Sequence, residues 1–127
     1  MLRMIIADDH EVVRQSLIQL LREEFSPAHF EEAEDAQMLI EKVRLASWDI
    51  VITDLAMPGG GGLEALKTIR KTHASLPVIV ISTYPAEQYA NRVLRAGAQA
   101  YVCKDALPGE LLQAVYQIIN AAKADPI

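Results

Sequence analysis

The sequence has little cysteine and no long apolar run, and both absences exclude whole classes of protein. Cys103 is the single cysteine among 127 residues, so no disulfide can form within the chain and a reducing cytoplasm is the expected compartment. The apolar run at residues 4–7 is cut off by two aspartates and is too short for a signal-peptide core. No apolar run approaches the roughly 18 residues of a membrane span, so no membrane association is expected.

Positive charge is also scarce. Lys and Arg number 12 against 17 Asp and Glu, which gives a formal net charge of −5. A surface that binds nucleic acid needs clustered Lys and Arg, so this charge balance argues against nucleic-acid binding by this domain. The hydrophobic fraction of 51% excludes a disordered chain, and the length fits one domain.

Short apolar runs alternate with longer stretches of helical periodicity. This pattern predicts strands at 4–7, 30–33, 50–53, 78–81 and 101–103, and helices at 11–24, 36–43, 63–70, 89–94 and 108–122. Unbroken apolar strands are typical of a parallel sheet that is buried on both faces. We therefore predict an α/β fold, a flavodoxin-like doubly wound (βα)5 with a five-stranded parallel sheet in the order 2-1-3-4-5.

The predicted boundaries leave one domain and a short end segment. Residues 1–122 form the expected domain, and residues 123–127 are expected to be a terminal tail or the start of a linker. Pro108 is expected to open the last helix, and Gly97 to close the fourth.

Polar side chains end four of the five predicted strands. Asp8 and Asp9 follow the first strand, Asp54 the third, Ser82 the fourth and Lys104 the fifth. In the predicted strand order these four strands are neighbours, and sites in open α/β sheets form at the carboxyl ends of strands. The five side chains are therefore expected to converge at one edge of the sheet.

Each of these residues also has a simpler interpretation. Asp8 or Asp9 can cap the helix that follows, and Ser82 can cap the fourth helix. Asp54 can serve the Pro-Gly turn after it, and Lys104 can be a solvated strand end. These residues stand at matching ends of adjacent strands. It is much less probable that all of the simpler interpretations hold at once than that the residues form one shared site.

The convergent residue types support one kind of chemistry. Carboxylates held about 4 Å apart repel each other by several kcal/mol, and a hard cation such as Mg²⁺ relieves that repulsion. A carboxylate can also act as a nucleophile and form an aspartyl-phosphate. Asp54 is the central carboxylate and hence the candidate acceptor, with Lys104 and the Ser82 hydroxyl placed to bind phosphoryl oxygens.

Four segments stand out by their order and spacing along the chain: Ile6-Ala7-Asp8-Asp9-His10, Ile52-Thr53-Asp54-Leu55-Ala56-Met57-Pro58-Gly59, Ile81-Ser82-Thr83 and Ala100-Tyr101-Val102-Cys103-Lys104-Asp105. Together they resemble the receiver domain of two-component response regulators. The stretch from Met57-Pro58-Gly59 to Gly62-Leu63-Glu64 and the Lys104-Asp105 pair look like the LuxR-type (NarL/FixJ-like) subfamily.

The resemblance implies a phosphorylation site and a partner. A sensor histidine kinase would donate a phosphoryl group to Asp54, and Asp8, Asp9, Asp54 and the backbone carbonyl of Ala56 would hold Mg²⁺. The domain would act as a switch rather than as an enzyme with its own substrate. A homodimer on phosphorylation is a further expected partner. DNA would be bound only through a C-terminal output domain that lies outside this chain.

The resemblance also implies a conformational switch. Ser82 would turn toward the phosphoryl group and Tyr101 would move inward, which changes the surface of the fourth helix, fifth strand and fifth helix. Met57, Thr83 and Tyr84 would form the rim of the phosphoryl pocket, and Tyr84 is expected to shield the site from water.

Two rival functions stay open on the sequence alone. One is a stand-alone receiver that works by protein–protein contact or as a phosphorelay intermediate. The other is a Mg²⁺-dependent aspartyl-phosphate phosphohydrolase, which would need a general acid two residues after Asp54. Ala56 occupies that position and has no acidic group, which ranks the hydrolase lower.

Overall fold

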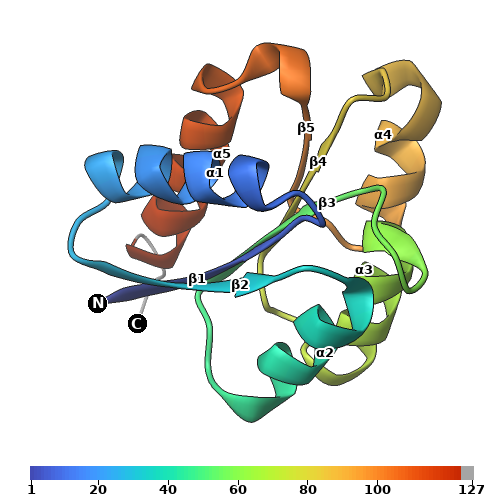
Figure 1. Cartoon of the computed structure of the whole chain (residues 1–127), viewed down its shortest axis with the longest axis horizontal. Helices are drawn as coiled ribbons and strands as arrows, with labels where there is room; N and C mark the ends of the chain where they lie inside the picture. Colours follow the sequence, from blue (N-terminus) through green and yellow to red (C-terminus); the bar gives the residue numbers. More distant parts are fainter. Residues whose placement is uncertain (124–127) are drawn as a thin grey trace.

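A five-stranded parallel sheet runs through the molecule with helices on both of its faces, as the computed structural model shows (Figure 1). The structure describes residues 1–123. The strand order is β2-β1-β3-β4-β5, so the predicted fold class and strand order are confirmed. In chain order the elements are β1 Leu2–Ala7, α1 Glu11–Glu24, β2 Ala28–Ala33, α2 Ala36–Leu45, β3 Ile50–Asp54, α3 Gly61–Thr72, β4 Val78–Ser82, α4 Ala86–Arg95, β5 Ala100–Cys103, the 3-10 turn Lys104–Ala106 and α5 Gly109–Lys123.

Alternate residues of the inner strands face opposite helix layers. In β1, Met4 and Ile6 pack with residues of α1 and α5, whereas Ile5 and Ala7 pack with residues of α2, α3 and α4. All four side chains are at most 2% exposed, and burying a side chain of Leu or Ile size contributes about 1.5–3 kcal/mol. Burial on both faces is why these strands lack a polar alternation.

The predicted strand starts need correction at one end of the sheet. β1 begins at Leu2 instead of residue 4, and β2 begins at Ala28 instead of residue 30. The added residues are only half-buried, and they include Arg3 and His29. Because half-buried positions accept polar side chains, apolar patterning did not mark them as strand.

The last helix also begins later than predicted. A turn of 3-10 helix over Lys104–Ala106 follows β5, and α5 begins at Gly109. The carbonyl of Pro108 accepts a hydrogen bond from the Leu112 N–H at 3.1 Å, so Pro108 precedes the helix as its cap. Gly97 adopts a φ of +111° one residue after Ala96, the C-cap of α4, as its predicted capping role requires.

The predicted end of the domain falls close to the end of α5. The helix continues to Lys123, one residue beyond the predicted domain, and residues 124–127 of the predicted tail lie outside the described part of the chain. Within residues 1–123, none of the helices combines the length and the apolar character that crossing a membrane requires.

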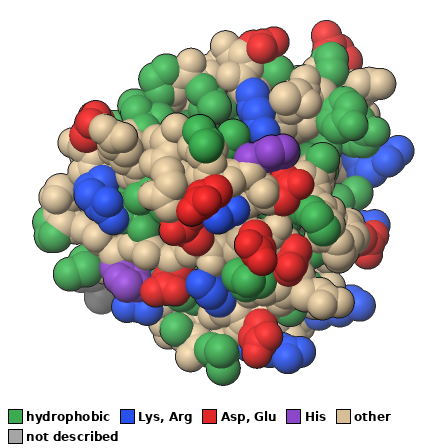
Figure 2. Space-filling model, in the orientation of Figure 1, with side chains coloured by type: hydrophobic (Ala, Val, Ile, Leu, Met, Phe, Trp, Pro, Cys, Tyr) green, Lys and Arg blue, Asp and Glu red, His purple; other side chains and the backbone are tan. Residues whose placement is uncertain are grey.

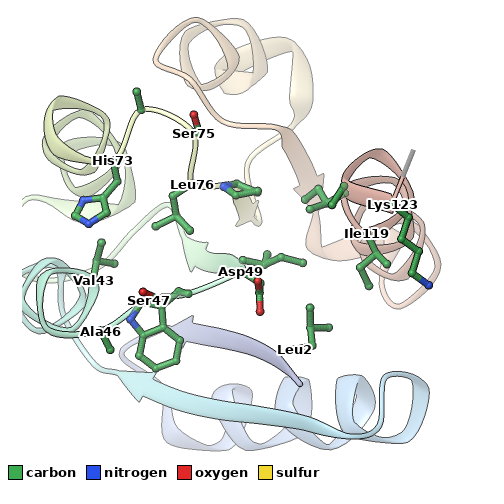
Figure 3. A pocket seen from close by; sticks show the side chains of 16 residues that line it. Leu2, Val43, Ala46, Ser47, Asp49, His73, Ser75, Leu76, Ile119 and Lys123 are labelled. Carbon is green, nitrogen blue, oxygen red and sulfur yellow. The ribbon is translucent and has the colours of Figure 1, made fainter. Parts of the chain in front are cut away.

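An apolar groove of about 830 Å³ lies at the amino end of the sheet. Figure 3 shows Leu2, Leu76 and Ile119 among the side chains that line it, from β1, the segment before β4 and α5. Trp48 also lines the groove, and its indole Nε1 donates a hydrogen bond to the Lys42 carbonyl at 2.9 Å.

Candidate functional site

The opposite, carboxyl edge of the sheet brings the predicted acidic residues together. Ala7 of β1 pairs with Thr53 of β3, so the residues that follow them, Asp8 and Asp54, lie side by side. Asp8 is 1% exposed and Asp54 is 7% exposed. Oxygen atoms of Asp8, Asp9 and Asp54 lie within 4.8 Å of one another. The predicted convergence of the three carboxylates is therefore present in the structure.

Lys104 is the cation of this site. Its Nζ lies 3.4 Å from Asp54 Oδ2 and 3.6 Å from Asp8 Oδ2, so one ammonium group serves two carboxylates. The side chain reaches the site from the 3-10 turn that follows β5, two strands away from Asp54's own strand. One ammonium cannot balance the cluster, because Asp9 adds a third carboxylate.

Burial raises the pKa of Asp54 above the ordinary aspartate value of 3.8, because removing the carboxylate from water disfavours its charge. The Lys104 ammonium lowers this pKa in part, and the charge of Asp8 raises it further. A carboxylate cluster with excess negative charge and a buried centre fits a hard divalent cation, which prefers such oxygen donors. The acidic site can thus hold a metal ion.

The backbone of Asp54 is held by close contact with the start of α3. A Cβ at Gly62 would collide with the Asp54 carbonyl oxygen, so only glycine allows the helix to approach this closely. The Thr53 hydroxyl donates to the same carbonyl at 3.0 Å, and the Ala56 N–H reaches Asp54 Oδ1 at 3.4 Å. Gly62 and the Thr53 hydroxyl therefore fix the Asp54 backbone, and the Ala56 N–H contacts its carboxylate.

Arg14 is a residue of this site that the sequence prediction missed. It is 9% exposed, and its Nη1 donates to the carbonyl of Asp8 at 2.7 Å while its Nε donates to Glu32 Oε1 at 2.8 Å. A signal was present, because Arg14 shares the buried face of its helix with Leu17, Ile18 and Leu21. The guanidinium positions the Asp8 backbone rather than touching a carboxylate of the cluster.

His10 is the second missed residue. It occupies the N-cap position of α1 without a side-chain cap, and its Nδ1 lies 3.0 Å from Asp8 Oδ1 and 3.2 Å from Asp9 Oδ1. Asp8 Oδ1 accepts a hydrogen bond from the His10 N–H at 2.8 Å, so Asp8 orders the turn before the helix and does not cap it. The adjacent Asp-Asp-His order in the sequence was the available signal.

Ser82 lies at the same edge but is connected to a different network. It is 1% exposed, and its Oγ accepts a hydrogen bond from the Tyr84 N–H at 2.9 Å. The N-cap of α4 is Pro85, so the alternative in which Ser82 caps that helix is wrong. The Tyr101 hydroxyl donates to the Tyr84 carbonyl at 2.7 Å, so one residue, Tyr84, links Ser82 to Tyr101 through its backbone.

The residues predicted for the pocket rim differ in their surroundings. Met57 is half-buried against the core, and its Sδ accepts from the Thr53 hydroxyl at 3.8 Å. Thr83 is exposed. The Tyr84 side chain is 42% exposed, and its ring lies 5.0 Å from that of Tyr89 in α4. The rim roles, and the shielding role of Tyr84, stay predictions.

Charge on the visible face of the molecule is mixed. Figure 2 shows Lys and Arg interspersed with Asp and Glu, with no broad basic area on this face. Binding to a polyanion needs positive charge gathered on one surface, so this face offers no such surface.

The sheet is flavodoxin-like, and its carboxyl edge holds the buried Asp54 carboxylate, two further aspartates and a lysine. These features define the class of protein as an α/β domain whose chemistry lies at the ends of its strands. Residues 4–116 match the response regulator receiver domain family. The chain belongs to that family.

Relatives and solved structures agree with this assignment. The chain is 30% identical over 115 residues to the response regulator GacA of Pseudomonas viridiflava, which covers 91% of this chain and 54% of GacA. A crystal structure of a LuxR-family response regulator from Aurantimonas sp. SI85-9A1 superposes with a TM-score of 0.87 at 32% identity, over 94% of this chain and 85% of that one.

A third comparison concerns a relative solved with a ligand. The response regulator TrrA of Thermotoga maritima, in complex with Mg²⁺-BeF, superposes with a TM-score of 0.83 at 30% identity, over 93% of this chain and 99% of that one. The present chain spans about half the length of the curated relatives that it matches.

Proposed function

We propose that Asp54 accepts a phosphoryl group from a phosphohistidine of a sensor histidine kinase in a Mg²⁺-dependent reaction. The observation that carries the proposal is the buried Asp54 carboxylate with the Lys104 ammonium 3.4 Å from one oxygen and two further aspartates beside it. The ion would be held by Asp8, Asp9, Asp54 and the backbone carbonyl of Ala56. The relative solved with Mg²⁺-BeF supports the choice of Mg²⁺.

In the transfer step, an Asp54 carboxylate oxygen attacks the phosphorus atom of the phosphohistidine. The new bond is O–P, the bond that breaks is N–P, and the leaving imidazole keeps the electron pair and takes up a proton. Lys104 stabilises the negative charge of the phosphoryl oxygens from the position in which it now contacts Asp54 Oδ2. When bound, Mg²⁺ supplies charge neutralisation for the same oxygens.

Phosphorylation would reach a distant surface through the backbone of Tyr84. If Ser82 Oγ turns to donate to a phosphoryl oxygen, the Tyr84 N–H loses the acceptor that it has at 2.9 Å. The Tyr84 carbonyl is the acceptor of the Tyr101 hydroxyl, so a shift of the Ser82–Tyr84 turn also moves the contact that holds Tyr101. This linkage supports a switch of the α4–β5–α5 surface, with Tyr101 as its reporter.

The effect of the proposed switch would be exerted through a further domain of a longer protein. Because the chain spans about half the length of its curated relatives, we propose that it controls a C-terminal DNA-binding transcription-regulator domain. A stand-alone receiver that acts by protein contact, or in a phosphorelay, is the second candidate. A homodimer on phosphorylation, a cytoplasmic location and a domain boundary near residue 122 stay predictions.

Labelling with a small phosphodonor tests the central proposal. The chain is incubated with acetyl phosphate and Mg²⁺, and its intact mass is measured with and without EDTA. We expect one phosphate adduct that requires Mg²⁺, is absent in Asp54→Asn and persists in Asp49→Asn. Asp49 is a matched control because it is exposed and lies at the opposite end of the sheet.

Two results would overturn the assignment. An adduct that persists in Asp54→Asn would place the acceptor elsewhere, and an adduct that forms equally in EDTA would remove the metal ion from the reaction. An assay of inorganic phosphate tests the rival function. Release of inorganic phosphate from a small phosphomonoester would favour a phosphohydrolase. The absence of a general acid at Ala56 argues against that outcome.

A further inference from the structure

Arg70, in the last turn of α3, binds the segment between α4 and β5. Its Nε and Nη2 atoms donate to the Gly97 carbonyl at 3.0 and 2.7 Å, and Nη2 also donates to Gln99 Oε1 at 3.2 Å. Nη1 donates to the carbonyl of His73, at the end of the same helix, at 2.9 Å. A guanidinium presents its donors in a rigid planar fork, so it holds these segments in a defined geometry. Arg70 therefore joins the end of α3 to the residues that follow α4.

Gln99 extends this connection to the sheet. Its Oε1 accepts a hydrogen bond from the Val78 N–H at 2.8 Å, and its own N–H donates to the Val78 carbonyl at 2.8 Å. Val78 is the first residue of β4 and is fully buried. A Cβ at Gly97 would lie 2.6 Å from Arg70 Nε, so the guanidinium packs directly against the turn after α4. The end of α4 is thus attached both to α3 and to the sheet.

The start of α4 is attached much more weakly than its end. Residues 83–88 are all exposed, whereas Gly97 is half-buried and Ala98 is buried. The N-cap residue is Pro85, which makes no side-chain cap. Across the whole of α4, which the structure describes completely, Val93 is the one buried residue, and it lies close to the end of the helix. Burial and hydrogen bonding therefore both fix α4 at the same end.

We infer that Arg70 makes the residues after α4 a hinge, so that α4 moves by rotating its start about Gly97 rather than by shifting as a whole. A helix of ten residues is about 15 Å long, so a small rotation at one end displaces the other end by several ångströms. The inference rests on the proposed function only for the cause of the motion, because a shift of the Ser82–Tyr84 turn would act on the start of α4. A partner that recognises the switched state would then contact changed positions over residues 84–89 and unchanged positions over 96–99.

Amide hydrogen exchange of the unphosphorylated chain tests the attachment without any phosphoryl transfer. Rates are measured for the wild type, Arg70→Met, Arg70→Lys and Lys71→Met, each normalised to amides of the central strand β3 to remove global opening. In Arg70→Met, amides of residues 96–99 should exchange at least roughly tenfold faster, because hydrogen bonds from a charged donor are lost. Amides of residues 90–92 should change less than about twofold, because they lie outside the opened segment.

The other two variants test the geometry of the contact. Arg70→Lys should give intermediate rates at residues 96–99, because an ammonium keeps the charge but cannot reproduce the fork of donors. It also carries the comparison if Arg70→Met does not fold. Lys71→Met is the matched control, since Lys71 is the next residue of α3 and is exposed, and its rates should equal those of the wild type.

Phosphorylation tests the direction of the motion. The chain is labelled with acetyl phosphate and Mg²⁺, and its backbone amide chemical shifts are compared with those of the unlabelled chain. In the wild type, the changes should be severalfold larger over residues 84–89 than over 96–99. In Arg70→Met, the changes over 96–99 should become as large as those over 84–89, because the end of α4 is no longer fixed. A role of Arg70 in stability alone would not alter this distribution.

These measurements separate the hinge from the proposed function. Equal exchange at residues 96–99 in Arg70→Met and Lys71→Met would overturn the inference, and so would equal shift changes at both ends of α4 in the labelled wild type. Neither result affects the labelling of Asp54. If the chain takes no phosphate on Asp54 but Arg70→Met speeds exchange at residues 96–99 alone, the proposed function fails and the hinge stands.

Discussion

The two ends of the sheet contain opposite kinds of side chain. At the amino end, polar groups beside the groove have protein partners: Asp49 Oδ2 accepts from the Arg3 N–H at 2.8 Å, and Trp48 Nε1 donates to the Lys42 carbonyl. At the carboxyl end, three aspartates cluster around one lysine that contacts only two of them, and burial raises the pKa of Asp54. One end therefore supports stability, whereas the other keeps excess negative charge that is useful only when a cation or a phosphoryl group arrives.

The largest expected effect on stability comes from the close contact between Gly62 and the Asp54 carbonyl. Gly62→Ala should lower the free energy of unfolding by about 2–3 kcal/mol, because the new Cβ would collide with the Asp54 carbonyl and force the backbones apart. Urea denaturation measures this loss, and phosphate labelling should fall with it. Gly109→Ala is the matched control, since a Cβ there meets nothing within 4 Å. Equal stability of the two variants would contradict the close approach.

A substitution at the amino end should affect stability alone. Trp48→Ala should cost about 2 kcal/mol, because the half-buried indole loses its packing and its hydrogen bond to the Lys42 carbonyl. It also loses the Arg3 guanidinium, which lies 4.7 Å from the ring centroid. The rate of phosphate labelling at a temperature where the variant is folded should equal that of the wild type. A reduced rate would show that the two ends are not independent.

Arg14→Met tests whether the Arg14 guanidinium positions Asp8 by donating to its backbone carbonyl. The expected loss of stability is about 1–2 kcal/mol, because the hydrogen bond to the Asp8 carbonyl disappears while Glu32 keeps Gln15 as a partner. The concentration of Mg²⁺ needed for half-maximal labelling should rise as well. Arg22→Met, on the exposed side of the same helix, should lower stability by at most about 0.5–1 kcal/mol, because the guanidinium lies 5.2 Å from the Phe30 ring centroid, and should leave the Mg²⁺ requirement unchanged.

The smallest expected effect has the opposite sign. Asp54→Asn should raise the free energy of unfolding by about 1 kcal/mol in EDTA at neutral pH, because it removes a buried charge that burial disfavours. The pKa of Asp54 is higher in the folded chain, so wild-type stability is reduced as pH rises above 3.8 and the carboxylate ionises. The advantage of the variant should therefore shrink as the pH is lowered toward 3.8. Denaturation in EDTA across this range measures the difference, and added Mg²⁺ should stabilise the wild type more than the variant.

The sequence was sufficient for the parts of the fold and site that depend on pattern. Continuous apolar strands predicted the sheet, and the polar residues at their ends predicted that Asp8, Asp54 and Lys104 meet. The sequence pattern was insufficient where a side chain contacts a residue of another helix, strand or turn. Arg14 of α1 contacts Glu32 of β2, and the ring orientation of His10 depends on the turn before α1. Periodicity marks Arg14 as buried, but it identifies neither contact.

The pairing of β1 with β3 has a consequence for when the chain becomes reactive. Asp8 and Asp54 are far apart along the chain, and only the register Ala7 to Thr53 makes them neighbours. Contacts between distant parts of a chain form late, after the entropy of closing the intervening loop has been overcome. A nascent or partly folded chain therefore contains Asp54 but no assembled acceptor site. Competence to take phosphate should appear in the same cooperative transition as the native sheet, so that a kinase can signal only through molecules that have finished folding.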